Sequence, residues 1–279
     1  MSARDIMKLK SVIRRIAKEE GVMAQSVLQT FMFERLLARL VKTTVRDNLI
    51  IKGGLLLSNL FGLSRRTTMD LDASVRDIKL DETNIRNILS EVFATDVNDG
   101  VTFELKSISP IRDDDIYGGF RVKFIARLET LVVQLSADFS TGDVVIPEPK
   151  EYYFKSCFVD NLFFKVWGYT IETTLAEKIE TVLTRGILNT RPRDFYDIKT
   201  LAESFKPDLQ LLRVALHETC KHRGTLSVLD DPLSKIEELR TDPTLLDQWN
   251  RYRKTYSYAS GYSFSDMCES ISTLLSNLT

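Results

Sequence analysis

The sequence contains few of the residues on which disulfide-rich, zinc-binding and membrane-spanning proteins depend. Its 279 residues include three cysteines and two histidines. The cysteines, Cys157, Cys220 and Cys268, are widely spaced and odd in number, and this pattern excludes a disulfide framework and the usual zinc motifs. No run of about 18 apolar residues occurs, and no apolar signal core follows the first residues. We therefore expect a protein of the reducing cytoplasm that makes no membrane contact.

The chain also lacks a large excess of charge of either sign. Lysine and arginine together number 38, aspartate and glutamate 39, and the formal net charge is -1. Net charge therefore neither requires nor excludes a nucleic-acid partner, and any basic surface must be local. Hydrophobic residues make up 43% of the sequence, which is enough for a sizeable core.

Apolar periodicity predicts helices first, then a mixed region of strands and helices, then helices again. Expected helices cover residues 4–20, 24–46, 54–62 and 81–96, and expected strands cover 48–52, 69–75, 101–109, 118–127 and 131–139, with a tight turn at Glu129-Thr130. After the break at Pro147-Glu148-Pro149 comes a short apolar piece at 159–166, followed by helices at about 172–188, 194–204, 208–222, 231–239, 243–257 and 264–277. We predict an α+β protein of two domains, residues 1–160 and 161–279.

The most informative segment is a glycine turn followed by two closely spaced aspartates. An apolar β-type run, residues 49–51, leads into Gly53 and Gly54, and a short apolar helix follows. Asp70 and Asp72 then alternate with apolar residues on an expected strand, so both carboxylates point to the same face. Adjacent carboxylates repel, and a divalent cation such as Mg²⁺ relieves that repulsion. Because backbone N–H groups at a glycine turn can hold phosphate, the segment outlines a nucleotidyltransferase. The alternative is a pair of solvated aspartates on a strand.

Three further charged residues near these segments can serve the same chemistry. Arg65 precedes the aspartates in a cationic loop and can meet a triphosphate. Asp138 ends the expected strand 131–139, from which it can reach a metal held by the neighbouring pair. Lys178 lies beside the buried stripe of the helix expected at 172–188. The alternatives are that Asp138 solvates its strand end and that Lys178 pairs with a surface carboxylate.

Two residues extend this set in the C-terminal half. Arg185 follows Lys178 by seven residues on the same edge of the helix, where both can hold a triphosphate. Asp194 lies where the next helix is expected to begin, a position that favours aspartate as an N-terminal cap. Capping is one explanation of Asp194, and orientation of a nucleotide or a nucleic-acid end is the other.

In this order, the segments resemble the AbiEii-type nucleotidyltransferases, the toxins of type IV toxin–antitoxin and phage abortive-infection systems, which include the MenT toxins. The resemblance spans residues 25–205 and rests on residues 51–54, 65–72, 134–138, 176–178 and 193–197. It implies a polymerase-β-like nucleotidyltransferase core with a mixed sheet, followed by a helical C-terminal domain. Arg193 replaces the lysine of the family's R-x-K-D block, and Gly54 replaces the serine of the broader superfamily.

The resemblance also implies roles for individual residues. Asp70 and Asp72 match the paired metal-binding acids, Asp138 is similar to the third acid, Lys178 matches the lysine of the A-E-K block, and Asp194 matches the acid of the R-x-K-D block. The implied nucleotide-binding residues are Gly53, Gly54, Arg65, Lys178 and Arg185. The implied reaction uses Mg²⁺ or Mn²⁺ and transfers NMP from an NTP to an acceptor, with release of pyrophosphate.

The family further implies tRNA, at its 3′ end, or another RNA as acceptor, and a cognate antitoxin as partner. Two alternatives stay open at this point. The acceptor can be a hydroxyl of a small molecule or protein, or the fold can act only as a nucleic-acid or partner-binding module. Pure binding would not need the acid pair. If the enzyme reading holds, we expect the acids at 70, 72 and 138 to serve one site together with Lys178 and Asp194.

Overall fold

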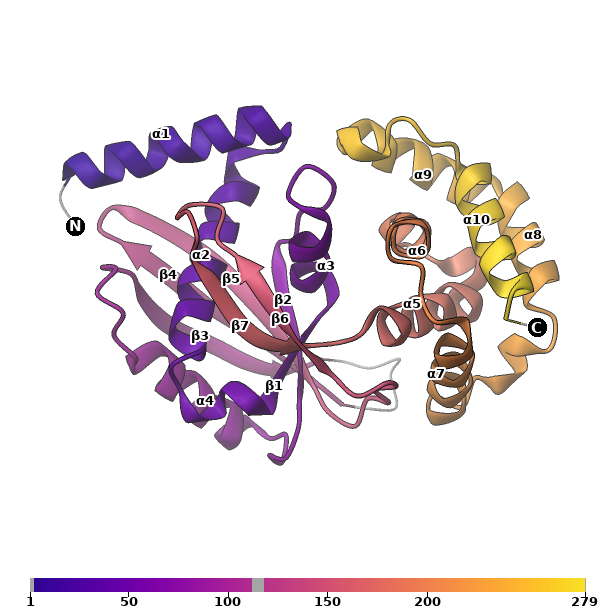
Figure 1. The fold of residues 1–279 in the computed structure, drawn as a ribbon, viewed down its shortest axis with the longest axis horizontal. Coiled ribbons are helices and arrows are strands. Elements are labelled where there is room, and N and C mark those ends of the chain that lie inside the picture. Colours follow the sequence, from indigo (N-terminus) through magenta and orange to yellow (C-terminus); the bar gives the residue numbers. More distant parts are fainter. Residues whose placement is uncertain (1–2, 112–117, 279) are drawn as a thin grey trace. The chain divides into compact units, whose positions relative to one another are not determined.

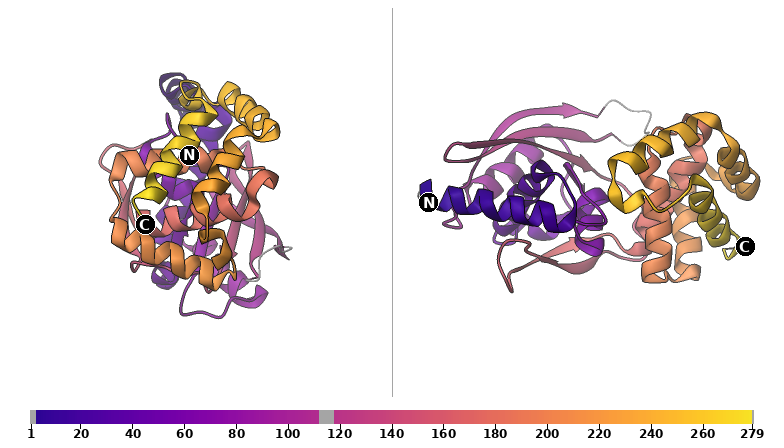
Figure 2. Two further views of the ribbon diagram at one scale, coloured as in Figure 1. Left: turned by 90° about the vertical axis from the view of Figure 1, so that its right-hand side faces the viewer. Right: turned by 90° about the horizontal axis from the view of Figure 1, so that it is seen from above.

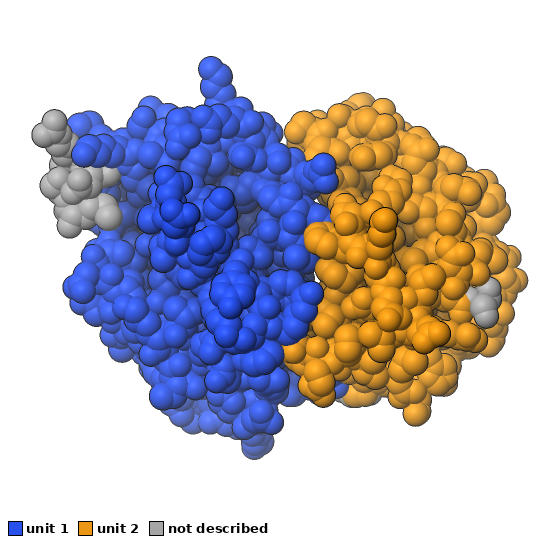
Figure 3. All heavy atoms as spheres, viewed as in Figure 1, with its two compact units in different colours: residues 1–143, 150–168 blue, residues 144–149, 169–279 orange. Residues whose placement is uncertain are grey.

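The computed structural model describes residues 3–111 and 118–278. The chain forms two compact units, coloured separately in Figure 3: residues 1–143 and 150–168 make up the first, and residues 144–149 and 169–279 the second. Every described strand lies in the first unit, and the second is built of helices (Figures 1 and 2). This organisation confirms the α+β fold class. The sequence suggested a division near residue 160, whereas the first unit continues to residue 168.

A mixed sheet of seven strands forms the centre of the first unit, in the order β3-β4-β5-β2-β1-β7-β6. The strands are β1 (Leu49–Lys52), β2 (Asp70–Val75), β3 (Thr102–Pro110), β4 (Phe120–Leu128), β5 (Leu131–Ser140), β6 (Lys150–Lys155) and β7 (Phe163–Gly168). β2 pairs in parallel with β5, and β1 pairs in parallel with β7. The other neighbours are antiparallel.

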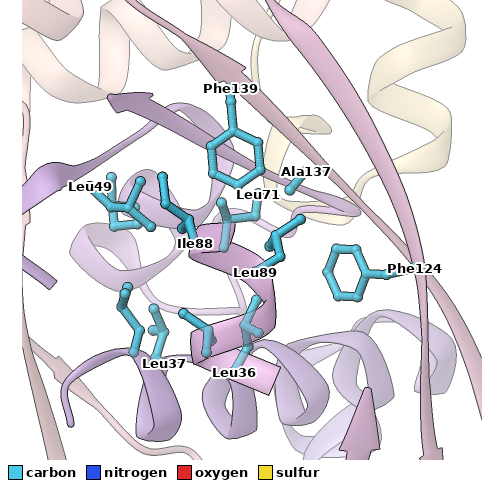
Figure 4. Close-up of a pocket in the computed structure, with 12 residues that line it drawn as sticks. Leu36, Leu37, Leu49, Leu71, Ile88, Leu89, Phe124, Ala137 and Phe139 are labelled. Carbon is cyan, nitrogen blue, oxygen red and sulfur yellow. The ribbon is translucent and has the colours of Figure 1, made fainter. Parts of the chain in front are cut away.

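Helices cover one face of this sheet and form the core with it. The helices of the first unit are α1 (Ala3–Glu20), α2 (Ala24–Leu40), α3 (Gly53–Phe61) and α4 (Glu82–Ala94). Apolar side chains of α2 and α4 meet Leu71 of β2 and Ala137 of β5 around a cavity of about 20 Å³ (Figure 4). Its lining is apolar, so it has no partner for water. Since side chains alternate along a strand, the residues on either side of Leu71, Asp70 and Asp72, point to the opposite face.

The second unit packs its helices around aromatic side chains. Its helices are α5 (Ile171–Arg185), α6 (Pro192–Phe205), α7 (Leu209–His222), α8 (Pro232–Thr241), α9 (Pro243–Thr255) and α10 (Phe264–Ser276). Three of them begin with proline, whose fixed φ suits the first helical position. Trp249 of α9 is buried against Phe264 of α10, at 6.2 Å between ring centroids. Across the described residues of both units, no helix is long and apolar enough to cross a membrane.

One expectation about these elements is wrong, and one strand was missed. The helix expected over 24–46 ends at Leu40, where the Thr43 hydroxyl donates to the Leu40 carbonyl at 2.7 Å, and residues Thr44–Asn48 form a 3-10 helix. Strand β6 was not expected. Its buried Tyr152 and Phe154 alternate with more exposed neighbours, but this signal spans only six residues after the proline-rich break.

A buried ion pair ties α2 to the loop before β3. The Arg39 guanidinium donates to Asp99 Oδ1 at 2.8 Å and to Asp99 Oδ2 at 2.9 Å, and it also reaches the Val101 carbonyl at 2.6 Å. Burial alone would raise the pKa of Asp99, but the hydrogen bonds from Arg39 and the Val101 N–H outweigh it and hold that pKa below its usual value. The pair therefore stabilises the fold as long as Asp99 is ionised.

Asp99→Ala is expected to lower the free energy of unfolding by about 3 kcal/mol, because it leaves the Arg39 guanidinium buried without its carboxylate. Urea denaturation at pH 7 measures this, and Asp96→Ala, an exposed carboxylate in the same loop, should cost less than about 1 kcal/mol. The Asp99 contribution is present above its unfolded pKa of 3.8 and is lost as the pH falls through its lower folded pKa. The difference between wild type and Asp99→Ala should therefore shrink below pH 3.8; an equal difference at all pH values would contradict the assignment.

Candidate active site

Three aspartates gather on the face of the sheet opposite α2 and α4. β2 and β5 are adjacent and parallel, and their register places Asp72 beside Asp138 and Asp70 beside Ser136. Register partners on neighbouring strands project to the same face, so the structure brings Asp70, Asp72 and Asp138 together. The Ser136 hydroxyl donates to Asp70 Oδ1.

Two cations flank these acids along the same row of the sheet. Lys52 of β1 is the register partner of Asp72, and Arg121 of β4 is the register partner of Asp138. Arg121 forms a two-pronged ion pair, with Nε 2.8 Å from Asp138 Oδ1 and Nη2 2.6 Å from Asp138 Oδ2. Lys52 Nζ donates to Asp143 Oδ2 at 2.8 Å. The row thus carries two negative charges between two positive ones.

Sequence reasoning included Lys52 in the segment 51–54 without giving it a role, and it did not name Arg121, although one signal for Arg121 was available. The two-residue turn expected at Glu129-Thr130 is present between β4 and β5, with Leu128 opposite Leu131. Counting back along both strands from this pair places Arg121 opposite Asp138, as observed. The turn and the strand lengths together therefore predict the pairing of Arg121 with Asp138.

The glycine turn before α3 lies directly against Asp72. Gly53 has φ +60°, and a Cβ added there would lie 2.0 Å from Asp72 Oδ2. A Cβ on Gly54 would lie 2.4 Å from the Thr68 hydroxyl oxygen, so neither position has room for a side chain. The Gly54 N–H points at Asp72 Oδ2 over 3.4 Å. The anion at the start of α3 is thus the Asp72 carboxylate, and phosphate binding by Gly53 and Gly54 stays a prediction.

The surroundings of Asp72 are unfavourable for its ionised carboxylate. Burial raises the pKa of Asp72, and the negative charges of Asp138 and Asp70 raise it further, while Lys52 and the Gly54 N–H act in the opposite direction. An additional cation beside Asp72 would stabilise the ionised form of this carboxylate.

The donor set has the chemistry that a hard divalent cation prefers, since three carboxylates lie on neighbouring positions. Among the residues that the structure describes, however, no group of three acidic, histidine or cysteine side chains is close enough to form a ready metal site. In this structure Arg121 engages both oxygens of Asp138, and the Ser136 hydroxyl engages Asp70. The donor chemistry of the three acids fits a divalent cation, and a cation that engages Asp138 has to displace Arg121 from it.

The loop before β2 contains one exposed and one buried arginine. Arg66 is buried and its guanidinium donates to the Thr67 carbonyl, so it supports the loop. The Thr68 hydroxyl donates to the Asp70 carbonyl at 2.8 Å and fixes the start of the strand. Arg65 is exposed, so a ligand can reach its side chain.

The second unit contains its own cluster of charges, formed by α5 and α6. Lys178 Nζ lies 2.6 Å from Asp194 Oδ1 and 2.8 Å from Asp197 Oδ2, and both acids are buried. Of the two explanations for Asp194, capping is not observed, because α6 begins at Pro192 and Asp194 is its third residue. Arg185 is the last residue of α5. The pairing of Lys178 with Asp194 inside its own unit is one of the alternatives left open by the sequence, and a role of both in a shared site stays a prediction.

Comparison with known proteins identifies a family. A family model described as nucleotidyl transferase AbiEii toxin, type IV TA system, matches residues 35–270. No curated protein matches the chain.

Three solved structures resemble the chain at low identity. A nucleotidyltransferase candidate from H. pylori is 20% identical, with a TM-score of 0.49 over 92% of this chain and 99% of that one. JHP933 from Helicobacter pylori is 21% identical, with a TM-score of 0.48 over 89% and 94%. An antigenic nucleotidyltransferase-like protein from Paracoccidioides brasiliensis is 15% identical, with a TM-score of 0.38 over 78% and 93%.

Asp72→Asn is expected to raise the free energy of unfolding by about 1 kcal/mol at pH 7, because it removes a partly buried charge that two other acids repel. The folded pKa of Asp72 is raised, so ionisation of Asp72 destabilises the wild type as the pH rises above its unfolded value of 3.8. The gain should therefore be largest at neutral pH and vanish as the pH falls toward 3.8. Thermal unfolding with and without Mg²⁺ measures it: added Mg²⁺ should stabilise the wild type and not the variant. A variant less stable than wild type at pH 7 would contradict this account of Asp72.

Proposed function

The chain belongs to the AbiEii family of nucleotidyltransferase toxins of type IV toxin–antitoxin systems, and we propose that it transfers NMP from an NTP to the 3′ end of tRNA. The observation that supports this reaction best is the row of side chains across β1, β2, β5 and β4, in which Asp72 and Asp138 lie between Lys52 and Arg121. Such a row concentrates negative charge at one spot and supplies positive charge beside it. Metal-bound triphosphates require both.

In this proposal Asp70, Asp72 and Asp138 hold Mg²⁺ or Mn²⁺, which when bound neutralises the phosphates of the NTP. The protein's own contribution is positioning. The acceptor hydroxyl oxygen forms a bond to the α-phosphorus, the bond from that phosphorus to pyrophosphate breaks, and Asp138 takes the hydroxyl proton. Arg65, exposed in the loop before β2, binds the departing phosphates.

Residues of the second unit enter the proposal through the family blocks. Lys178, with Arg185, is assigned to the triphosphate, and Asp194 orients Lys178, to which it is already bound at 2.6 Å. Lys178 is held by two buried acids and has a fixed position, as a phosphate ligand needs. Gly53 and Gly54 are assigned to the close approach of the nucleotide beside Asp72.

A non-catalytic binding module on the same fold is the competing function. Three carboxylates crowded on one face destabilise a protein, and binding of RNA or of an antitoxin gives no reason to keep them. The crowding at Asp72 therefore favours catalysis. Cytoplasmic action, a cognate antitoxin and a role in defence against phage complete the proposal.

Asp72→Ala is expected to reduce nucleotide transfer at least about 100-fold, because it removes the acid nearest the other two, while leaving the fold intact. Purified protein is incubated with each radiolabelled NTP, Mg²⁺ and total tRNA, and labelled RNA and pyrophosphate are measured. Asp160→Ala, an exposed carboxylate in the same unit, is the matched control and should transfer at the wild-type rate. Undiminished transfer by Asp72→Ala would remove Asp72 from the site, and label found only on protein or small molecules would overturn RNA as acceptor.

Expression of the wild type is expected to slow bacterial growth, and Lys178→Ala should relieve this, with transfer at least about 100-fold lower, because the triphosphate loses its fixed ammonium. The same change leaves Asp194 and Asp197 without their shared cation, so soluble protein level and melting temperature are measured alongside growth. Lys199→Ala, which removes a partly buried lysine paired with Glu203 in α6, controls for loss of a structural ion pair. If Lys178→Ala is less stable but equally toxic at equal protein level, Lys178 has only a structural role.

A further inference from the structure

Arg121 forms an ion pair with Asp138, the third acid of the proposed site. Its guanidinium meets Asp138 side-on, with contacts of 2.8 Å and 2.6 Å to the two carboxylate oxygens. We propose that Arg121 is a positioning residue that exchanges partners: it binds Asp138 in the metal-free protein, and it releases Asp138 and binds a phosphate oxygen of the NTP when the three aspartates take up a divalent cation. This inference rests on the proposed nucleotidyl transfer and adds a residue that the family blocks do not contain.

The exchange follows from the charges on this face of the sheet. A divalent cation at the three aspartates repels a guanidinium on the same carboxylate, because two positive charges would then share Asp138. The phosphates that accompany the cation attract the same guanidinium. Arginine suits both partners, since its planar fork matches a carboxylate and a phosphate equally in two-pronged geometry.

The side chain of Arg121 is free to make this movement. It is 51% exposed, whereas the side chain of Asp138 is 22% exposed. The guanidinium therefore lies on the solvent side of the pair and can turn away without opening the core. Lys52, the other cation of the row, is held by Asp143 at 2.8 Å and is only 15% exposed, so its position is more restricted.

The fold does not depend on the pair. Backbone pairing joins β4 to β5 from Phe120 to Leu128, and Val122, Phe124 and Ala126 of β4 are buried in the core. An ion pair on the exposed side of such a hairpin contributes little to stability. Replacement of Arg121 should accordingly leave the protein folded, and its effects should appear in ligand binding.

The test uses the full chain and two binding measurements that need no transfer. Isothermal titration calorimetry gives the affinity for Mn²⁺ alone, and then for a non-hydrolysable NTP analogue at saturating Mn²⁺. Arg121→Ala is expected to bind Mn²⁺ about threefold to tenfold more tightly, because Asp138 is free, and the analogue about tenfold more weakly, because a phosphate ligand is lost. Opposite changes of the two affinities mark the exchange, since general damage would weaken both.

Arg127→Ala is the matched control. Arg127 lies on the same strand, is similarly exposed and pairs with Glu104 at 3.2 Å, away from the aspartates. Both affinities of this variant should stay within about twofold of wild type. In the background of Asp138→Asn, adding Arg121→Ala should give no further gain in Mn²⁺ affinity, because the carboxylate for which the cations compete is gone.

Arg121→Lys separates loss of the fork from loss of charge, and it serves as the deciding variant if Arg121→Ala does not fold. It keeps a positive charge but cannot grip both oxygens, so it should still bind Mn²⁺ more tightly than wild type. Unchanged or weaker Mn²⁺ binding by Arg121→Ala, undiminished binding of the analogue, or wild-type Mn²⁺ affinity in Arg121→Lys would each overturn the proposal. If both affinities change as expected but no RNA is labelled, the acceptor in the proposed function is wrong and the exchange by Arg121 stands.

Discussion

Repulsion between carboxylates on two parallel strands is the constraint around which the first unit is organised. The register of β2 and β5 sets Asp72 beside Asp138, with Asp70 one step along the same face. Left alone, these charges would oppose the pairing of the strands. Lys52 and Arg121 on the outer neighbours, the Ser136 hydroxyl and the Gly54 N–H all act against that repulsion. The strands on either side therefore bring groups that reduce the repulsion within the central parallel pair, while backbone pairing and the buried side chains hold the strands together.

The same constraint explains why the turn into α3 consists of glycines. The backbone at Gly53 approaches Asp72 so closely that a methyl group would overlap a carboxylate oxygen. Its φ of +60° is also one that residues with a side chain rarely adopt. A turn of this kind aims the start of a helix, with its partial positive charge, at the acids. In the described structure the Gly54 N–H at the helix start points at Asp72, an acid of the site itself, and phosphate binding at this turn stays a prediction.

Local patterns predict much of this fold, whereas the partners of the charged residues depend on long-range pairing. The alternation around Asp70 and Asp72 and the helical periods after residue 171 are signals within one element, and the elements form where they are expected. β6 was missed because its alternation of buried and exposed residues extends over only six residues. Lys178 could not be assigned from its own helix, since both acids that hold it come from α6. The pairing of Arg121 could be predicted although its partner lies on another strand, because the turn at Glu129-Thr130 fixes its register with Asp138.

Each unit pairs some of its charged groups with opposite charges of the same unit, and this has a consequence for ligand binding. Asp138 is bound by Arg121 in the first unit, and Lys178 is bound by Asp194 and Asp197 in the second. A ligand that engages any of these groups must compete with a partner already within hydrogen-bond distance, so part of its interaction energy goes into separating that pair. At the row of the first unit, a metal-bound triphosphate can meet this requirement because its cation replaces Arg121 at Asp138 and its phosphate replaces Asp138 at Arg121. A ligand of one sign satisfies only half of the groups and leaves the others exposed to like charge. The ion pair between Arg121 and Asp138 therefore favours a ligand that brings cation and phosphate together over either one alone.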